Sequence, residues 1–265
     1  MATVATVAAP SAEGVRGDSF FLWSAIAMAL VIVAGFSLQL AMGRSSFAAS
    51  PPLVHAHAIV FMGWVAIYVA QNALVARGSI ALHRRLGWIA AGWIVAMCVL
   101  GCAVTLAMVR EARTPFFFTP LQFLILDPVS IFSFAGLSVA AIVLRRQTDW
   151  HRRLHFCGMA ILMGPAYGRL LPLPLLIPWA YEATFAAVMI FPVIGVIADL
   201  RRTGRVHPAW GWGIGTIVLV TLLLVESLSQ SSIGVVLYQA ATAGSPGAAV
   251  APLAFPPFPP LAPHP

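Results

Sequence analysis

Long apolar stretches alternate with short polar connections along most of the chain. Each stretch is close to the roughly 20 residues that an α-helix needs to cross the hydrocarbon core of a bilayer. The seven stretches cover residues 20–42, 53–75, 85–109, 121–144, 153–172, 174–198 and 210–238. Because backbone polar groups cannot stay unpaired in lipid, and because the alternation typical of barrel strands is absent, the pattern predicts an all-α membrane bundle of about seven transmembrane helices.

The composition favours the same class of protein. Of the 265 residues, 60% are hydrophobic and only 9% are charged, which is about a third of the usual charged share of a soluble protein. We therefore expect the lipid bilayer to be the main partner of the surface. No nucleotide-binding loop or nucleic-acid motif accompanies the apolar stretches, so we expect no nucleic-acid partner.

Three parts are expected along the chain. Residues 1–19 form an N-terminal cytoplasmic segment, which lacks the basic region and short apolar core of a signal peptide. Residues 20–240 form the membrane domain. Residues 241–265 are small and rich in proline, which predicts a disordered tail or a polyproline-like extension.

The distribution of arginines predicts the orientation. The chain contains no lysine, and ten of its 15 basic residues lie in three alternate connections. These residues are Arg77, Arg84, Arg85, Arg145, Arg146, Arg152, Arg153, Arg201, Arg202 and Arg205. The positive-inside rule places these connections and the N-terminus in the cytoplasm, and the C-terminus outside.

Several ionisable side chains interrupt the apolar stretches at a similar depth in the predicted outer half. They are His57, Asp127, Arg169, Glu182 and Glu226. Buried charge is expensive in a bilayer and often marks function. We therefore take Asp127, Glu182, Glu226 and Arg169 as candidate catalytic residues, whose carboxyl groups could supply a general acid.

The same layer has two other interpretations. His57, Asp127 and Glu182 form a candidate ligand set for a divalent transition metal such as zinc, iron or manganese. Alternatively, Arg169 forms a structural ion pair with Asp127 or Glu182 and only fixes the packing of the helices. Helical spacing places Asp127 on one stripe with Ser130, Phe134 and Ser138, which we expect to face the interior of the bundle.

A group of histidines is predicted near the cytoplasmic face. His83, His151 and His155 are candidate cofactor-binding residues, and His151 and His155 share one helical face because they are four residues apart. His83 and His155 could ligate a b-type haem between two helices. Anchoring at the lipid headgroups and an anion-binding pocket are the alternatives.

Three segments carry a resemblance to a known group of proteins. They read HAHAIVFMGWVAIYVAQNALVARGSIALHRRLGW, DWHRRLHFCGMAILMGPAYGRL and DLRRTGRVHPAWGWG. Over about residues 53–213 the chain resembles uncharacterised bacterial inner-membrane proteins that share HRRLG, H(K/R)RL and GRVHP motifs. The resemblance implies a multi-pass protein of the bacterial inner membrane, with family-type positions at His57, Gln71, His83, Arg84, His151, Arg152, Arg169, Asp199, Arg205 and His207.

A looser similarity is to cytochrome b561-type proteins, in which pairs of helices hold two haems. Here Asp127 stands where the outer haem would need a histidine, so this resemblance implies at most one haem. The sequence leaves three functions open: a redox or metal-binding membrane protein, an intramembrane enzyme, or a proton-coupled transporter. The enzyme would act on a lipid, isoprenoid or quinone substrate by Asp/Glu acid–base chemistry, and the transporter would relay protons through buried carboxylates.

Overall fold

The computed structural model describes residues 12–258, with side chains from residue 19 onward, and all regular secondary structure in this part of the chain is helical. This confirms the predicted all-α class. The elements are α1 (Ala12–Ala41), α2 (Pro52–Ala76), α3 (Ile80–Arg110), α4 (Pro120–Val143), α5 (Thr148–Ile161), α6 (Gly164–Leu170), η1 (Leu173–Leu176), α7 (Ala180–Val188), α8 (Ile190–Thr203), α9 (Pro208–Thr216), the π-helical η2 (Ile217–Leu224), α10 (Val225–Ser229), α11 (Ser232–Thr242) and η3 (Pro246–Ala249).

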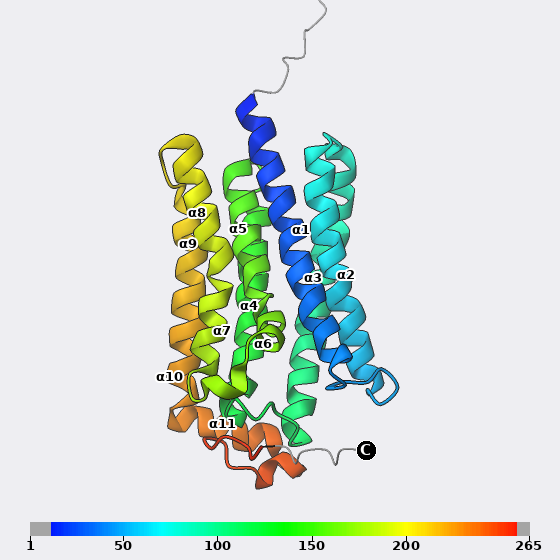
Figure 1. Cartoon of the computed structure of the whole chain (residues 1–265), viewed down its shortest axis with the longest axis vertical. Helices are drawn as coiled ribbons and strands as arrows, with labels where there is room; N and C mark the ends of the chain where they lie inside the picture. Colours follow the sequence, from blue (N-terminus) through cyan, green and yellow to red (C-terminus); the bar gives the residue numbers. More distant parts are fainter. Residues whose placement is uncertain (1–11, 259–265) are drawn as a thin grey trace, which may run out of the picture.

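Among the described residues, six segments are helical, long and apolar enough to cross a membrane. They are Ser19–Ala41, Pro52–Ala76, Ile80–Arg110, Pro120–Val143, Ala180–Thr203 and Pro208–Ser229. The predicted crossing at 153–172 is made by two shorter helices, α5 and α6, which together run from the upper end of the bundle into its lower half (Figure 1). The chain is therefore a multi-pass membrane bundle.

The break between α5 and α6 has a local cause in the sequence. Pro165 has no backbone N–H, so it cannot donate to the carbonyl of Ile161 and continue the helix. Ala166 and Tyr167 instead both donate backbone hydrogen bonds to the carbonyl of Met163, each at 3.0 Å. The chain restarts as α6, which is displaced from the line of α5 and lies beside α1 (Figure 1).

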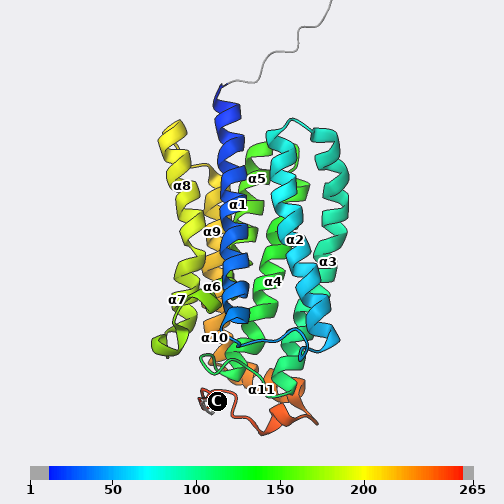
Figure 2. The ribbon, with the colours of Figure 1, turned by 45° about the vertical axis from the view of Figure 1, so that its right-hand side comes forward.

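Neighbouring helices pack in sequence around the bundle, α1 on α2, α2 on α3, α3 on α4 and α4 on α5 (Figure 2). α6 packs closely against α1 where both helices have small residues, Gly35 in α1 and Ala166 in α6. A Cβ added at Gly35 would lie 2.7 Å from the carbonyl oxygen of Ala166. Small residues allow such close approaches between membrane helices. The main core contains the fully buried Phe156, Met159 and Trp210.

The last crossing was predicted over residues 210–238, and the crossing in the structure ends about two turns earlier. The crossing ends at Ser229, and α11 starts separately and lies across the lower end of the bundle (Figures 1 and 2). Ser231 has extended backbone angles and its hydroxyl accepts a hydrogen bond from the backbone N–H of Gly234, so it caps a new helix. Apolar composition alone does not reveal this turn, because α11 is itself apolar.

Part of the Pro-rich tail packs against the bundle, which differs from the disorder expected for 241–265. The carbonyl of Pro252 accepts a hydrogen bond from the backbone N–H of Leu121, and the carbonyl of Gly247 accepts one from the Tyr238 hydroxyl, both at 3.0 Å. The centre of the Phe258 ring lies 4.6 Å from the centre of the Phe116 ring. Residues 1–11 of the predicted N-terminal segment, and 259–265 of the tail, lie outside the described part.

The predicted orientation can be tested with single cysteines in a variant lacking the three native ones. Ser46→Cys, in the exposed α1–α2 connection, should react with a membrane-impermeant maleimide on intact spheroplasts. Gln147→Cys, in the exposed α4–α5 turn, should react only after the membrane is permeabilised. Ala25→Cys, at a fully buried position, is the unlabelled control. The opposite pattern of labelling would contradict a cytoplasmic N-terminus.

Candidate functional site

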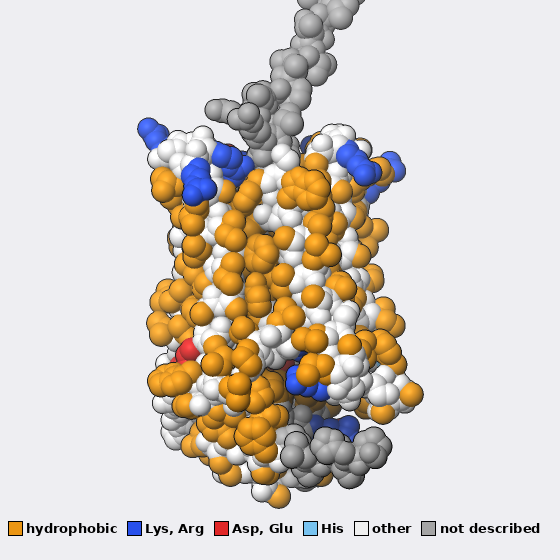
Figure 3. All heavy atoms as spheres, in the orientation of Figure 1, with side chains coloured by type: hydrophobic (Ala, Val, Ile, Leu, Met, Phe, Trp, Pro, Cys, Tyr) orange, Lys and Arg blue, Asp and Glu red, His pale blue; other side chains and the backbone are white. Residues whose placement is uncertain are grey.

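Charged side chains occupy two regions of the bundle. Arginines gather at the upper end in Figure 3, which carries the α2–α3, α4–α5 and α8–α9 turns and is called the basic end below. The ionisable residues predicted as a functional layer lie in the opposite half: His57 in α2, Asp127 in α4, Arg169 in α6, Glu182 in α7 and Glu226 in α10. The structure divides these residues into two groups with different partners.

The first group, called the Asp127 group, consists of His57, Thr105, Asp127 and Arg169. The Thr105 hydroxyl lies 3.1 Å from Asp127 Oδ2 and 3.0 Å from the carbonyl oxygen of Gly101. A threonine hydroxyl has a single proton, so it cannot fully donate to both oxygens. If Asp127 is protonated, its carboxyl group donates to Thr105 while Thr105 donates to Gly101, and both contacts are satisfied. The geometry therefore suits an acid that gains and loses a proton.

Arg169 faces this carboxyl without forming the structural ion pair considered from the sequence. Among residues 19–258, the ion pairs within 4 Å join other side chains, at the basic end and between Arg113 and Glu111. Arg169 donates from Nη1 to the carbonyl of Pro165 at 2.7 Å, and its guanidinium lies 4.2 Å from the ring centre of Phe36. Its Nε is buried without a hydrogen-bond partner. Arg169 interacts electrostatically with both Asp127 and His57.

His57 completes the Asp127 group from α2. Its ring stacks on Phe61 with the ring centres 4.1 Å apart, and its buried Nδ1 has no hydrogen-bond partner. An unpaired polar atom in an apolar surrounding costs free energy. His57 Nδ1 and Arg169 Nε are therefore two buried polar atoms without hydrogen-bond partners.

The second group, called the glutamate pair, consists of Glu182 and Glu226. Glu226 accepts hydrogen bonds from Gln122 Nε2 at 2.9 Å and from Gln230 Nε2 at 3.2 Å. The two carboxylates interact electrostatically with each other and with the phenol of Tyr181. Glu182 Oε2 and the Tyr181 hydroxyl are buried without hydrogen-bond partners.

The predicted transition-metal set, His57, Asp127 and Glu182, is divided between these groups. In the part of the chain that the structure describes, no three His, Cys, Asp or Glu side chains lie together as a group that could hold a metal ion. A site for zinc or iron needs several such ligands at about 2 Å from the ion. The geometry thus gives this prediction no support.

The candidate haem residues lie together at the basic end. The centre of the His151 ring lies 6.1 Å from that of His83 and 4.8 Å from that of His155. Both pairs of rings are arranged edge to face. His151 Nδ1 lies 2.8 Å from the carbonyl of Ala141, which fixes the proton on this nitrogen because a carbonyl only accepts. His83 and His155, the predicted axial ligands, therefore share a cluster with a third imidazole.

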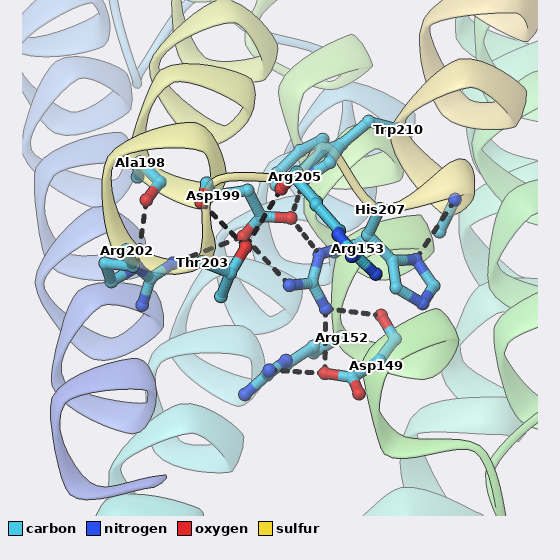
Figure 4. Close-up of polar contacts among 11 residues, drawn as sticks. Asp149, Arg152, Arg153, Ala198, Asp199, Arg202, Thr203, Arg205, His207 and Trp210 are labelled. Carbon is cyan, nitrogen blue, oxygen red and sulfur yellow. Dashed lines mark hydrogen bonds and ion pairs between the residues drawn. The ribbon is translucent and has the colours of Figure 1, made fainter. Parts of the chain in front are cut away.

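The most complete polar network at the basic end is centred on Arg153 and Asp199 (Figure 4). Arg153 donates from Nε to Asp199 Oδ2 at 2.7 Å and from Nη2 to Oδ1 at 2.8 Å. Its Nη1 donates to the backbone carbonyl and the side chain of Asp149. Trp210 donates its indole N–H to Asp199 Oδ2 at 2.8 Å. Arg153 and Asp199 are only 4% and 1% exposed, so these contacts satisfy a fully buried ion pair.

This network joins α5, α8 and α9. Gly195 makes room for the indole of Trp210, because a Cβ at this position would collide with the ring. His207 caps α9: its Nδ1 accepts a hydrogen bond from the backbone N–H of Ala209 at 3.2 Å. The GRVHP segment therefore organises the α8–α9 turn around Asp199.

Sequence reasoning missed several partners of these groups. Arg153 was recognised as part of an HRRL segment but not as a buried ion-pair residue, although the repeated motif and the isolated Asp199 were available signals. Thr105 and Gln122 lie on different helices from the carboxyl groups that they contact. Nothing in their local sequence signals these contacts.

An apolar groove of about 740 Å³ lies between α4, α5, α9 and η2. Its wall on α4 includes Val129, Phe132 and Gly136. Val129 is two residues from Asp127 and so lies on a different face of the helix. The groove is therefore separate from the Asp127 group.

The Arg153–Asp199 pair should contribute strongly to stability. Asp199→Ala leaves the buried guanidinium of Arg153 without its main counter-charge, and we expect a loss of about 3–5 kcal/mol in the free energy of unfolding. Arg153→Met combined with Asp199→Leu should recover most of that loss, because neither charge then stays buried alone. Thermal unfolding midpoints in one detergent at one scan rate measure both effects. Equal midpoints for wild type and Asp199→Ala would contradict this role.

His207 should make stability depend on pH. Burial, followed by the positive charge of Arg153, lowers the pKa of His207 below its usual 6.5. The unfolded chain therefore binds a proton at His207 more readily than the folded chain does. The stabilisation associated with neutral His207 is present above about pH 6.5 and is lost as the pH falls toward the lowered pKa of the folded state. We expect the unfolding midpoint of wild type to fall further between pH 7.5 and 5.5 than that of His207→Asn, which keeps a capping side chain. The same fall in both proteins would refute this assignment.

Comparison of the chain with protein-family models, curated proteins and solved structures found no match. The resemblance based on the HRRL and GRVHP motifs therefore stays a prediction.

Proposed function

We propose that the chain is an intramembrane enzyme whose Asp127 exchanges a proton with a lipid or isoprenoid substrate. The contact that carries this proposal is the one between Asp127 and Thr105. When ionised, the carboxylate accepts the proton of the Thr105 hydroxyl at 3.1 Å; when protonated, it can donate to Thr105 while Thr105 donates to Gly101, so the contact serves both states. Such a group can act as a general acid and return to its starting state by taking up a proton.

Arg169 and His57 supply the binding part of the proposed site. The Nε of Arg169 is a donor without a partner, and His57 Nδ1 is a donor or acceptor depending on its tautomer. A substrate oxygen between these groups and Asp127 would fill both positions. The phenyl rings of Phe36 and Phe61, which contact Arg169 and His57, favour a substrate with an apolar body.

The place of the site along the membrane supports an amphipathic substrate. His57 is in the second turn of α2, and Arg169 is in the last turn of α6, so both lie near one end of their helices. A lipid held there keeps its oxygen-bearing head near the membrane surface while its chain stays in the hydrocarbon region. Quinones belong to the same substrate class, since they carry oxygens on an isoprenoid chain.

The proton-coupled transporter uses the same carboxyl group in a different way. A carrier must expose a protonated group to each side of the membrane in turn, so it predicts flux without any chemical change. The enzyme predicts a changed lipid. This difference separates the two functions experimentally.

Asp127→Asn tests the enzyme directly, because it keeps the shape of the side chain and removes its acid function. In cells that express the full chain, we expect lipid species that are absent from empty-vector cells, and a loss of at least about 100-fold in their rate of formation for Asp127→Asn. Thr105→Val should give a smaller loss, since the carboxyl group remains. Mass spectrometry of total lipid extracts measures these species.

Glu111→Gln is the matched control, because it makes the same carboxylate-to-amide change at an exposed residue. It should leave the lipid species unchanged. Identical extracts from wild-type and empty-vector cells, or from wild type and Asp127→Asn, would exclude the enzyme. Proton flux into proteoliposomes that requires Asp127, without altered lipids, would support the transporter instead.

A further inference from the structure

The apolar groove between α4, α5, α9 and η2 lies outside the proposed acid–base site and extends along the bundle. On α4 its lining runs from Val129 to Leu144, a length of about 22 Å at 1.5 Å per residue. This is more than half of the roughly 30 Å thickness of the hydrocarbon core. Phe132 and Trp212 belong to the lining and are 58% and 70% exposed, so the groove is open to the surrounding lipid.

The wall of the groove opposite α4 is a straight stripe of side chains. Trp212 and Thr216 in α9, and Val220 and Leu224 in η2, follow one another at intervals of four residues. In an α-helix of 3.6 residues per turn, positions with this interval drift around the helix axis. A π-helix has i→i+5 hydrogen bonds and therefore more residues per turn, so η2 opposes this drift. The stripe consequently faces the groove from α9 to the end of η2.

The interior of the groove suits a hydrocarbon chain. The two hydroxyl groups in its lining already donate within their own helices, Ser133 to the carbonyl of Val129 at 2.7 Å and Thr216 to that of Trp212 at 2.9 Å. A polar ligand placed there would lose its hydrogen bonds to water without replacing them. A Cβ added at Gly136 would meet no atom within 4 Å, so the groove is open at this position.

One end of the groove reaches the basic end of the bundle. Leu144 and Trp150 line the groove on either side of the α4–α5 turn. Arg145 and Arg146 lie in this turn and are both exposed. Indole side chains are favoured at the level of the lipid headgroups, so Trp150 stands where an acyl chain would meet its polar head.

The α8–α9 turn supplies a third arginine at the same place. The centre of the His207 ring lies 5.5 Å from that of the Trp150 ring, which brings this turn against the end of the groove. Arg205 lies two residues before His207 and is exposed. Three exposed arginines from two turns therefore surround the end of the groove.

The acidic side chains near these turns do not neutralise the three arginines. Asp149 pairs with Arg152 and Arg153, and Asp199 pairs with Arg153 and Arg202. Among residues 19–258, none of the ion pairs within 4 Å includes an arginine of the set at the end of the groove. This end therefore carries positive charge without a counter-charge from the described chain.

We infer that the groove binds an acyl chain of an anionic phospholipid, whose phosphate is held by Arg145, Arg146 and Arg205. Guanidinium groups bind phosphate through paired, charge-assisted hydrogen bonds, and basic side chains at the membrane surface attract anionic lipids. A second copy of the chain, inserted in the same direction, would instead bring its own arginines to this end, where like charges repel. The charge thus favours a lipid over a second copy as the occupant.

Photo-crosslinking of the full chain tests this site. The protein is placed in phosphatidylcholine nanodiscs that contain a trace of phosphatidylglycerol with a diazirine in one acyl chain. We expect mass spectrometry to locate the label on α4 and on the α9–η2 segment. Unlabelled phosphatidylglycerol should compete at least about tenfold better than added phosphatidylcholine, because only the former carries a net negative charge.

Matched variants separate the site from general attraction to the basic end. Replacing Arg145, Arg146 and Arg205 together by Gln should lower the labelling at least about tenfold. The same change at Arg77, Arg84 and Arg85, which are exposed in or next to the α2–α3 turn at the same end of the bundle, should leave it unchanged.

Two glycine variants test the groove itself. Gly136→Leu should fill it and lower the labelling, whereas Gly92→Leu, at an equally open helical position on α3, should not. Asp127→Asn should be labelled like wild type, so failure of the proposed enzyme would leave this result intact. Equal competition by the two lipids, equal loss with both sets of arginines, or a disulfide between two chains through Gly136→Cys in a variant without native cysteines would each overturn the inference.

Discussion

A polar group inside a lipid-embedded bundle must find its hydrogen-bond partner within the protein, because the hydrocarbon region offers none. The Arg153–Asp199 pair at the basic end meets this requirement: both side chains are nearly inaccessible, and each makes several hydrogen bonds. In the opposite half, Arg169, His57 and Tyr181 each keep a buried atom without a partner. At the basic end, His83 Nδ1 and Gln71 Oε1 also lack partners, so it is the Arg153–Asp199 pair, rather than the whole end, that fixes the helices.

The α5–α6 segment connects the Arg153–Asp199 pair at the basic end with the Asp127 group in the opposite half. Arg153, in the second turn of α5, anchors the segment to α8 through Asp199. The proline break then displaces α6 from the line of α5 and places it against α1, where Gly35 allows the backbones to approach. Arg169 consequently reaches the region of Asp127 while its guanidinium lies on Phe36 of α1. An uninterrupted helix would have presented Arg169 in a different direction.

Hydropathy and helical spacing predicted the positions of most crossings, because both depend on local composition. The stripe through Asp127 was also predictable: Phe134 and Ser138 are 1% and 0% exposed. The division of the acidic layer was not predictable, since the contacts of Thr105 with Asp127 and of Gln122 with Glu226 join separate helices. Such contacts depend on the rotation of each helix about its own axis, which a single sequence does not determine.

The two HRRL segments also show that the local sequence does not determine the burial of an arginine. Arg85, in the first segment, is exposed, whereas Arg153, in the equivalent position of the second, is buried. The local sequences are almost identical, so the difference comes from the neighbours: α5 packs against α8, which supplies the carboxylate of Asp199.

The two groups in the opposite half differ in charge balance. The Asp127 group contains one carboxyl and one guanidinium, so its formal charge is close to zero when both are ionised, and an uncharged or weakly polar substrate adds little electrostatic cost. The glutamate pair contains two carboxyl groups, Glu182 in the first turn of α7 and Glu226 near the end of the Pro208–Ser229 crossing. Neither forms an ion pair within 4 Å among the described residues. A neutral lipid bound there would leave the repulsion between the two carboxylates in place, so the Asp127 group suits the proposed substrate better.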